Sequence, residues 1–220
     1  SEKTVLMKCI VGLLTPEQGQ VLYDRRDFLS MGKREKKALR REMGMIFQSA
    51  ALFDSLTVLE NVMFPLDMFS DHNYRDRVKR ARFCLDRVNL ADAQNKYPAE
   101  ISGGMQKRVA IARAIALNPQ YLFCDEPNSG LDPKTSLVID ELIHDITIEY
   151  NITTIINTHD MNSVMNMGEN IVFIKEGVKE WQGTKEQVVS SNNKALNDFI
   201  FASDLLRKAS ELEEQQLCEG

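Results

Sequence analysis

Short apolar runs alternate with helical patterns in the second half of the chain, and this alternation restricts the fold more than any other feature. The apolar runs predict strands over residues 121–124, 153–157, 171–174 and 178–181. The apolar spacing between them predicts helices over residues 133–150 and 161–167. Because strands that alternate with helices favour a largely parallel sheet covered by helices, we expect an α/β fold.

The N-terminal residues are expected to supply further pieces of this core. Helices are predicted over residues 4–14 and 33–41, and short strands over residues 20–23 and 43–47. The first helix carries apolar side chains at three- and four-residue spacing, namely Val5, Leu6, Cys9, Ile10 and Leu13. The basic run 33–41 is interpreted as a solvated helix face, with a binding patch as the alternative.

Between these two regions, residues 57–119 are predicted to be all-helical. Thr57 and Glu60 have the spacing of a capping box, in which each side chain bonds the backbone amide of the other residue. A charged amphipathic helix is expected over residues 74–88, and Ser102-Gly103-Gly104 opens another helix that ends near Asn118-Pro119. The pattern therefore indicates an α/β core with a helical insert.

Two separate stretches carry residues suited to nucleotide chemistry. Lys3-Thr4 precedes an apolar helix, as in the end of a phosphate loop G-x-x-x-x-G-K-[ST], where the lysine binds phosphate and the hydroxyl binds Mg²⁺. Asp125 and Glu126 follow an apolar strand, and strand alternation would point their side chains to opposite sides. On their own, Lys-Thr at a helix start and an acidic turn after a strand are also compatible with purely structural roles.

Three weaker signals lie elsewhere in the chain, one before the acid pair and two after it. Ser102-Gly103-Gly104 offers free backbone amides at a helix start, which suits an anion, although such a triplet is often just a turn. Asp132 closes a Ser-Gly-Leu-Asp segment soon after the acid pair, and His159 follows a predicted strand. A histidine in that position is in many proteins only a polar boundary residue.

Composition excludes several classes of protein. The net charge of −5 argues against non-specific nucleic-acid binding, which requires a basic surface. The longest apolar run, residues 9–14, is far shorter than the roughly 20 residues of a membrane-spanning helix, and no secretory signal is expected at the N-terminus. The four cysteines are far apart and form no Cys-x-x-Cys pair, so neither a disulfide framework nor a structural zinc site is expected.

Taken in order, these motifs resemble the ATP-binding subunit of ABC transporters over essentially the whole chain. They are Lys3-Thr4, Gln48 after a strand, Ser102-Gly103-Gly104, Asp125-Glu126, Asp132 and His159. The resemblance implies a P-loop NTPase (RecA-like) core with an inserted helical subdomain. It places the core at residues 1–56 and 120–184, with its N-terminal part missing, the helical signature subdomain at 57–119, and a helical tail at 185–220.

The resemblance also implies roles for individual residues in a site that binds ATP and Mg²⁺. Lys3 and Thr4 match the end of Walker A, and Thr4, Gln48 and Asp125 match the groups that hold the metal. Glu126 matches the general base, His159 the switch histidine, and Gln48 the Q-loop glutamine that senses the permease. Ser102, Gly103 and Gly104 match the signature loop, and Asp132 the D-loop.

These roles imply particular partners. The signature loop contacts ATP held mainly by a second copy, so a head-to-tail homodimer is expected, together with a membrane permease and no nucleic acid. The permease would contact a groove near Gln48 that is lined by Phe47, Leu52, Phe53 and Leu56, although these residues are equally compatible with the core. The resemblance therefore implies a cytoplasmic protein that is peripheral on the inner membrane.

Within the family, two features are similar to the Mla subgroup, which energises phospholipid transport. They are the segment 45–62 and Met105, which stands where most members have glutamine. The ATPase of another importer, for instance one for amino acids, is the alternative. A non-catalytic nucleotide-binding or assembly subunit is the second alternative.

Two departures from the family pattern concern the phosphate loop. The sequence begins inside Walker A, and Glu2 precedes Lys3 where the motif has glycine. A carboxylate adds bulk where glycine lets phosphate approach the backbone. At ~4 Å and an effective dielectric of ~20, one phosphate charge would be repelled by about 4 kcal/mol, unless solvent or an outward side chain relieves it.

We therefore predict that residues 1–220 bind MgATP far more weakly than a homologue with a complete loop and have negligible turnover. The matched protein carries a complete loop ahead of Lys3 and the substitution Glu2→Gly, and is called the loop-restored protein below. It should bind MgATP and hydrolyse it. Isothermal titration compares the two affinities, and micromolar binding by residues 1–220 would contradict the prediction.

Overall fold

In the computed structural model, residues 2–202 are described, and they divide into two compact units. Residues 3–157 belong to the first unit, and Glu2 belongs with residues from Thr158 onward to the second. The C-terminal part of the predicted tail, residues 203–220, lies outside the described residues, as does Cys218. The two units are considered separately below.

A three-stranded parallel sheet forms the centre of the first unit, in the order β3 (Met43–Ile46), β4 (Tyr121–Asp125) and β5 (Thr153–Asn157). The central strand β4 is buried at every residue, as an apolar strand between two neighbours should be. Its last residue, Asp125, pairs with Asn157 at the end of β5. The mixed α/β class and the parallel sheet predicted from the sequence are confirmed.

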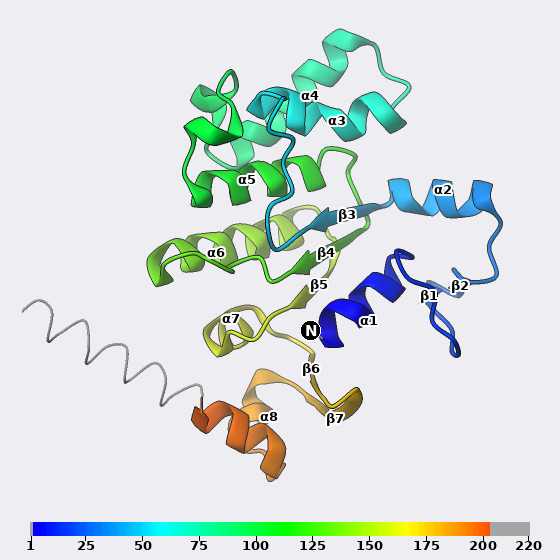
Figure 1. The fold of residues 1–220 in the computed structure, drawn as a ribbon, viewed down its shortest axis with the longest axis vertical. Coiled ribbons are helices and arrows are strands. Elements are labelled where there is room, and N and C mark those ends of the chain that lie inside the picture. The colour runs from blue at the N-terminus through cyan, green and yellow to red at the C-terminus, as the bar shows by residue number, and fades with distance from the viewer. Residues whose placement is uncertain (1, 203–220) are drawn as a thin grey trace, which may run out of the picture. The chain divides into compact units, whose positions relative to one another are not determined.

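The connections between these strands are helical (Figure 1). Between β3 and β4 the chain forms α3 (Val58–Phe69), α4 (Tyr74–Arg87) and α5 (Gly103–Ala114), with short 3₁₀ turns at η1 (Ala91–Ala93) and η2 (Pro98–Glu100). The crossover between β4 and β5 is α6 (Pro133–Glu149). Thr57 caps α3 through the predicted capping box, in which Glu60 N donates to Thr57 Oγ1 at 3.3 Å and Thr57 N donates to Glu60 Oε2 at 2.7 Å.

At the start of the unit, the chain forms α1 (Glu2–Ile10), β1 (Leu22–Tyr23), β2 (Arg26–Asp27) and α2 (Lys33–Arg41). The prediction for the first helix is wrong in two respects. It ends at Ile10 rather than Leu14, and its buried residue is Met7, whereas Val5 and Leu6 are 52% and 48% exposed. Met7 packs in one apolar cluster with Val11, which follows the helix, and with Tyr23, Phe28 and Phe123. Of the expected stripe, Ile10 packs against this cluster, whereas Val5 and Leu6 are exposed.

The second unit contains α7 (Met161–Met167), the antiparallel pair β6 (Ile171–Lys175) and β7 (Val178–Gly183), and α8 (Lys185–Val189), and residues 194–202 are also helical.

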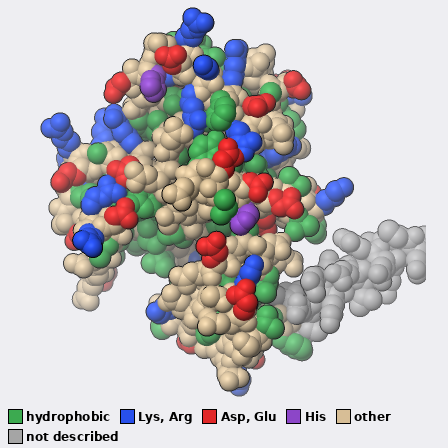
Figure 2. Space-filling view, turned by 180° about the vertical axis from the view of Figure 1, so that it is seen from behind, with side chains coloured by type: hydrophobic (Ala, Val, Ile, Leu, Met, Phe, Trp, Pro, Cys, Tyr) green, Lys and Arg blue, Asp and Glu red, His purple; other side chains and the backbone are tan. Residues whose placement is uncertain are grey.

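Among the described residues of the chain, no helix is both long and apolar enough to cross a bilayer. Acidic and basic side chains are interspersed on the face drawn in Figure 2. Cys9, Cys84 and Cys124 carry free thiols, and burial raises the pKa of Cys84 to about 11.

Helix α5 packs closely on β3 and on the loop that follows it. A Cβ atom at Gly44 would lie 2.5 Å from the Ala114 carbonyl oxygen, so only glycine permits this approach of strand and helix. Ala50 and Ala51 have left-handed backbone angles, with φ of 61° and 48°, which is unfavourable for residues with a Cβ atom. Arg113 of α5 stabilises this turn, because its guanidinium donates to the carbonyl oxygens of Ala50 and Ala51, each at 2.7 Å.

Arg113→Ala should lower the free energy of unfolding by about 1–3 kcal/mol, because it removes charge-assisted bonds that hold a strained turn. The matched control is Arg108→Ala on the same helix, where the native side chain makes one longer bond, at 3.4 Å, to Val88 O. Urea unfolding at an unchanged m-value measures both losses. Equal losses in the two variants would mean that Arg113 does not specifically stabilise the turn.

Candidate functional site

The carboxyl ends of β4 and β5 bring together residues that are far apart in the sequence. Thr4, in the first turn of α1, donates from Oγ1 to Asp125 Oδ1 at 3.2 Å. Asn157 Nδ2 donates to the same Asp125 oxygen and to Thr4 Oγ1, the latter at 3.3 Å. The structure therefore brings together Thr4 and Asp125, two of the three residues that the resemblance assigns to the metal.

Glu126 follows Asp125 but is not part of the strand. Its φ of 50° lies in the left-handed region, and its amide donates to Asn157 O at 2.8 Å. The chain turns at this residue, so the strand alternation expected for Asp125 and Glu126 does not extend to Glu126. Asp125 therefore ends the strand, and Glu126 lies on the turn that follows it.

Gln48 lies just after β3 and connects to the segment that follows the acid pair. Gln48 Nε2 donates to Ser129 Oγ at 3.0 Å. Its carbonyl oxygen accepts from Lys107 Nζ of α5, a side chain that is only 5% exposed. Burial lowers the pKa of Lys107, and the Glu126 carboxylate opposes that shift. Lys107 is therefore a buried cation that links α5 to the main chain of Gln48.

The Ser-Gly-Gly triplet forms a second cluster at the start of α5. Ser102 caps this helix, and its Oγ accepts from Met105 N at 3.3 Å. A Cβ atom at Gly104 would lie 2.7 Å from Thr135 Cγ2, so glycine allows the helix start to approach α6. Asp132 caps α6 by accepting from Thr135 N at 3.0 Å, and its bonds with Thr135 lower the pKa of the Asp132 carboxyl.

The remaining predicted residues lie at the beginnings of other elements. Lys3 is in the first turn of α1. His159 is exposed and belongs to the second unit, between β5 and α7. In that unit, the Glu2 carboxylate accepts from Gly177 N at 2.9 Å.

The residues around Asp125 fit a magnesium ion. Mg²⁺ prefers oxygen ligands and is usually held by one or two carboxylates together with substrate phosphates. Thr4 Oγ1 and Asp125 Oδ1 are such oxygens, and the buried Asn157 Oδ1 nearby makes no hydrogen bond with the described residues. No group of three or more His, Cys, Asp or Glu side chains suited to a metal occurs in residues 2–202, but a site completed by phosphate does not need one.

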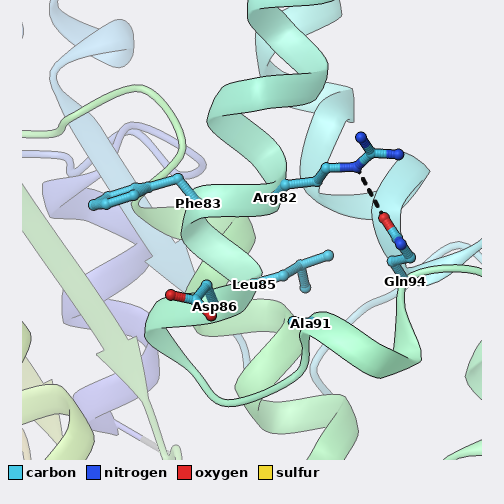
Figure 3. Close-up of a pocket in the computed structure, with 6 residues that line it drawn as sticks. All are labelled: Arg82, Phe83, Leu85, Asp86, Ala91 and Gln94. Atoms are coloured by element: carbon cyan, nitrogen blue, oxygen red, sulfur yellow. Dashed lines mark hydrogen bonds between the residues drawn. The ribbon is translucent and has the colours of Figure 1, made fainter.

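A pocket of about 320 Å³ lies elsewhere, in the helical region (Figure 3). Arg82, Leu85 and Asp86 of α4 line it together with Ala91 and Gln94, and Arg82 Nε donates to Gln94 Oε1 at 3.0 Å. None of the residues predicted to bind nucleotide lines this pocket. It therefore carries no part of the predicted chemistry.

Sequence reasoning missed three residues that contact the predicted ones: Lys107, Ser129 and Asn157. Asn157 had a visible signal, because it is a polar residue at the end of an apolar strand and directly precedes Thr158-His159. Lys107 had a weaker one, since it lies one helical turn after Gly103. The sequence marks Ser129 only as the first residue of the Ser-Gly-Leu-Asp segment and assigns it no role of its own.

Known proteins with similar sequences are ATP-binding subunits of transport systems. The methionine import ATP-binding protein MetN of Clostridioides difficile is 37% identical over 198 residues, which are 90% of this chain and 61% of that protein. The intermembrane phospholipid transport system ATP-binding protein MlaF of Haemophilus influenzae is 37% identical over 199 residues, 90% of this chain and 75% of that protein. The chain thus spans less than two thirds of the MetN relative and more of the MlaF relative.

Solved structures agree in fold. The dimeric, post-hydrolysis ATP-binding cassette MJ0796, bound to ADP and Pi, has a TM-score of 0.74 at 35% identity, covering 83% of this chain and 80% of that one. The cbiO1 protein of Clostridium perfringens, part of the ABC transporter complex cbiONQ, has a TM-score of 0.78 at 29% identity, covering 96% and 82%. These likenesses confirm the predicted P-loop core with a helical insert, of the ABC ATPase type. A family model described as ABC transporter also matches residues 1–129, and the chain belongs to this family.

Proposed function

We propose that this chain is the ATP-binding and ATP-hydrolysing subunit of an ABC transporter. The observation that carries the proposal is the contact of Thr4 with Asp125 at the carboxyl edge of the sheet, with Glu126 next in the chain. Open parallel sheets bind ligands at this edge, and the start of α1 adds backbone amides that favour anions. Solved relatives include a cassette bound to ADP and Pi, which supports nucleotide as the ligand.

Each predicted residue then has a defined task. Lys3 and the amides at the start of α1 bind phosphate, while Thr4, Asp125 and Gln48 hold Mg²⁺. The ion, when bound, neutralises charge that develops on the phosphoryl group. Glu126 orients the attacking water and accepts its proton.

His159, in our proposal, donates a hydrogen bond to the terminal phosphate. The chain has all three of Asp125, Glu126 and His159, and this intact set disfavours a purely non-catalytic subunit. That alternative predicts nucleotide binding without turnover even in the loop-restored protein.

A second copy of the chain would complete the site. Ser102, Gly103 and Asp132 are exposed, so the signature loop and the D-loop are accessible to a partner subunit. The cassette MJ0796 is dimeric, which supports a head-to-tail homodimer here. The proposed division has a nucleotide-binding core at residues 1–56 and 120–184, a signature subdomain at 57–119, and a tail at 185–220.

The permease would contact the loop after β3. Phe53 is 41% exposed, and its ring lies 4.6 Å from that of Phe64, which is 39% exposed. The buried Asn61 fixes this loop, since its Oδ1 accepts from Phe53 N at 2.8 Å and its Nδ2 donates to Phe53 O at 3.1 Å. Phe47, Leu52 and Leu56 are only partly buried, so with Phe53 they present apolar surface near Gln48. This surface, on the loop that Asn61 holds, is the proposed groove for the permease.

We further propose that the cargo is phospholipid and that the protein is peripheral on the cytoplasmic face of the inner membrane through its permease. Met105 after Ser102-Gly103-Gly104 and the likeness to MlaF support a phospholipid system. The equal identity to MetN keeps methionine or another amino acid as the alternative cargo. The permease that co-purifies with the chain distinguishes the two.

Glu126→Gln in the loop-restored protein should reduce ATP turnover by about 10²-fold or more, because it removes the general base and leaves Thr4 and Asp125 in place. Nucleotide binding should persist, and dimers should accumulate with ATP. The matched control is Glu141→Gln on the exposed surface of α6, with turnover near the parent value. Steady-state phosphate release measures both, and an active Glu126→Gln protein would exclude Glu126 as the base.

Phe53→Asp should release the protein from membranes that contain its permease while changing the free energy of unfolding by less than about 1 kcal/mol, as expected for an exposed position. Ile148→Asp, at a residue that is 61% exposed on α6, is the control that should remain bound. Co-sedimentation and thermal unfolding are measured together. If Phe53→Asp unfolds, Phe53 is a core residue, and if it folds and still sediments, the permease binds elsewhere.

A further inference from the structure

Asn157 contacts three groups of the candidate site at once. Its side-chain amide donates to Asp125 Oδ1 and to Thr4 Oγ1, and its main-chain oxygen accepts from the amide of Glu126 at 2.8 Å. Because a carboxylate only accepts hydrogen bonds, the NH₂ group of Asn157 must be the end that faces Asp125. Asn157 therefore bonds to two of the three proposed metal ligands, Thr4 and Asp125, and to the backbone of the proposed base.

The other end of this side chain is exceptional for a buried position. Asn157 is only 6% exposed, and its Oδ1 makes no hydrogen bond within the described residues. A buried polar atom without a partner costs about 1–3 kcal/mol, so an apolar side chain would stabilise a purely structural strand end better. Its neighbours in β5, Ile155 and Ile156, are apolar, so the amide of Asn157 departs from the pattern of the preceding strand residues.

We propose that Asn157 is a positioning residue for the Mg²⁺ site, an inference that rests on the proposed ATPase function. Its NH₂ group keeps the Asp125 carboxylate and the Thr4 hydroxyl at their observed separation, so both oxygens are oriented before the metal arrives. Its Oδ1 is left to accept a hydrogen bond from a water of the hydrated ion. Mg²⁺ keeps several waters when it binds proteins, so such a water is expected.

Asn157 also connects the proposed metal ligands to the segments on either side of them. Asn157 is directly followed by Thr158 and His159, so the strand end that orients the metal ligands is continuous with the predicted switch segment. The carbonyl of Asn157 also holds the turn at Glu126. Metal binding and the placement of the base are thereby coupled through one residue.

The test is Asn157→Leu in the loop-restored protein, because leucine has nearly the same shape but neither donates nor accepts hydrogen bonds. ATP affinity is measured by isothermal titration over a range of Mg²⁺ concentrations and in EDTA. In the parent, ATP affinity should increase with Mg²⁺ concentration. The Mg²⁺ concentration that gives half of this increase should be about 10- to 100-fold higher in Asn157→Leu, the range for losing a residue that orients metal ligands. Affinity in EDTA should stay within about twofold of the parent, since no phosphate contact is removed.

Thr154→Val is the matched control on the same strand. It removes the 2.7 Å hydrogen bond between Thr154 and Thr147 and should leave the Mg²⁺ requirement unchanged. Asn157→Ser, which is smaller and keeps one donor, covers the case in which leucine prevents folding, and should show an intermediate requirement. The readout is binding, so it does not depend on turnover.

Two outcomes would overturn the inference, and they are distinguishable. If the parent shows Mg²⁺-dependent ATP binding and a folded Asn157 variant shows the same requirement within twofold, Asn157 does not position the metal ligands and the ATPase proposal stands. If ATP binding by the parent does not respond to Mg²⁺ at all, the inference and the proposed function fail together.

Discussion

The parallel pairing of β4 with β5 is the constraint on which the candidate site depends. It sets Asp125 opposite Asn157 and brings the turn at Glu126 against the end of β5. The start of α1 reaches the same edge and adds Thr4. A shift of this register by one residue would move the side chains of β5 to the opposite faces of the sheet and take Asn157 away from Asp125.

The helical insert is joined to this sheet by cations of α5 rather than by apolar packing alone. Lys107 donates to the carbonyl of Gln48, and Arg113 donates to the carbonyls of Ala50 and Ala51. Burial lowers the pKa of both side chains because a charge is costly away from water, and these hydrogen bonds compensate part of that cost. The loop after β3 is thus held by the same helix whose first turn carries Ser102-Gly103-Gly104.

Most of the architecture could be predicted from the sequence because its signals are local. The capping box at Thr57, the basic helix α2 and the strands β3, β4 and β5 depend on spacing within a few residues. The burial of Met7 in α1 could not be predicted, because it depends on a cluster that includes Tyr23 and Phe123, which are distant in sequence.

The candidate site, like the fold, could be predicted from the sequence only in part. The proximity of Thr4 and Asp125 followed from motif order, whereas the hydrogen bonds of Asn157 and Lys107 arise only once strands and helices are packed. Glu126 shows the limit of periodicity, since alternation was expected to extend past the predicted strand, but the backbone turns at that residue. Spacing predicts which residues share an element, and tertiary packing decides which atoms meet.

The contacts of Arg113 and Lys107 also bear on how this surface can diverge between related proteins. Both cations bind main-chain oxygens, so the anchoring of residues 48–51 does not depend on the identity of the anchored side chains. Substitutions at the neighbouring exposed Phe53 would therefore change the surface while leaving these main-chain contacts in place. A backbone anchored through its own oxygens thus lets the chemistry of the surface change independently of the candidate site.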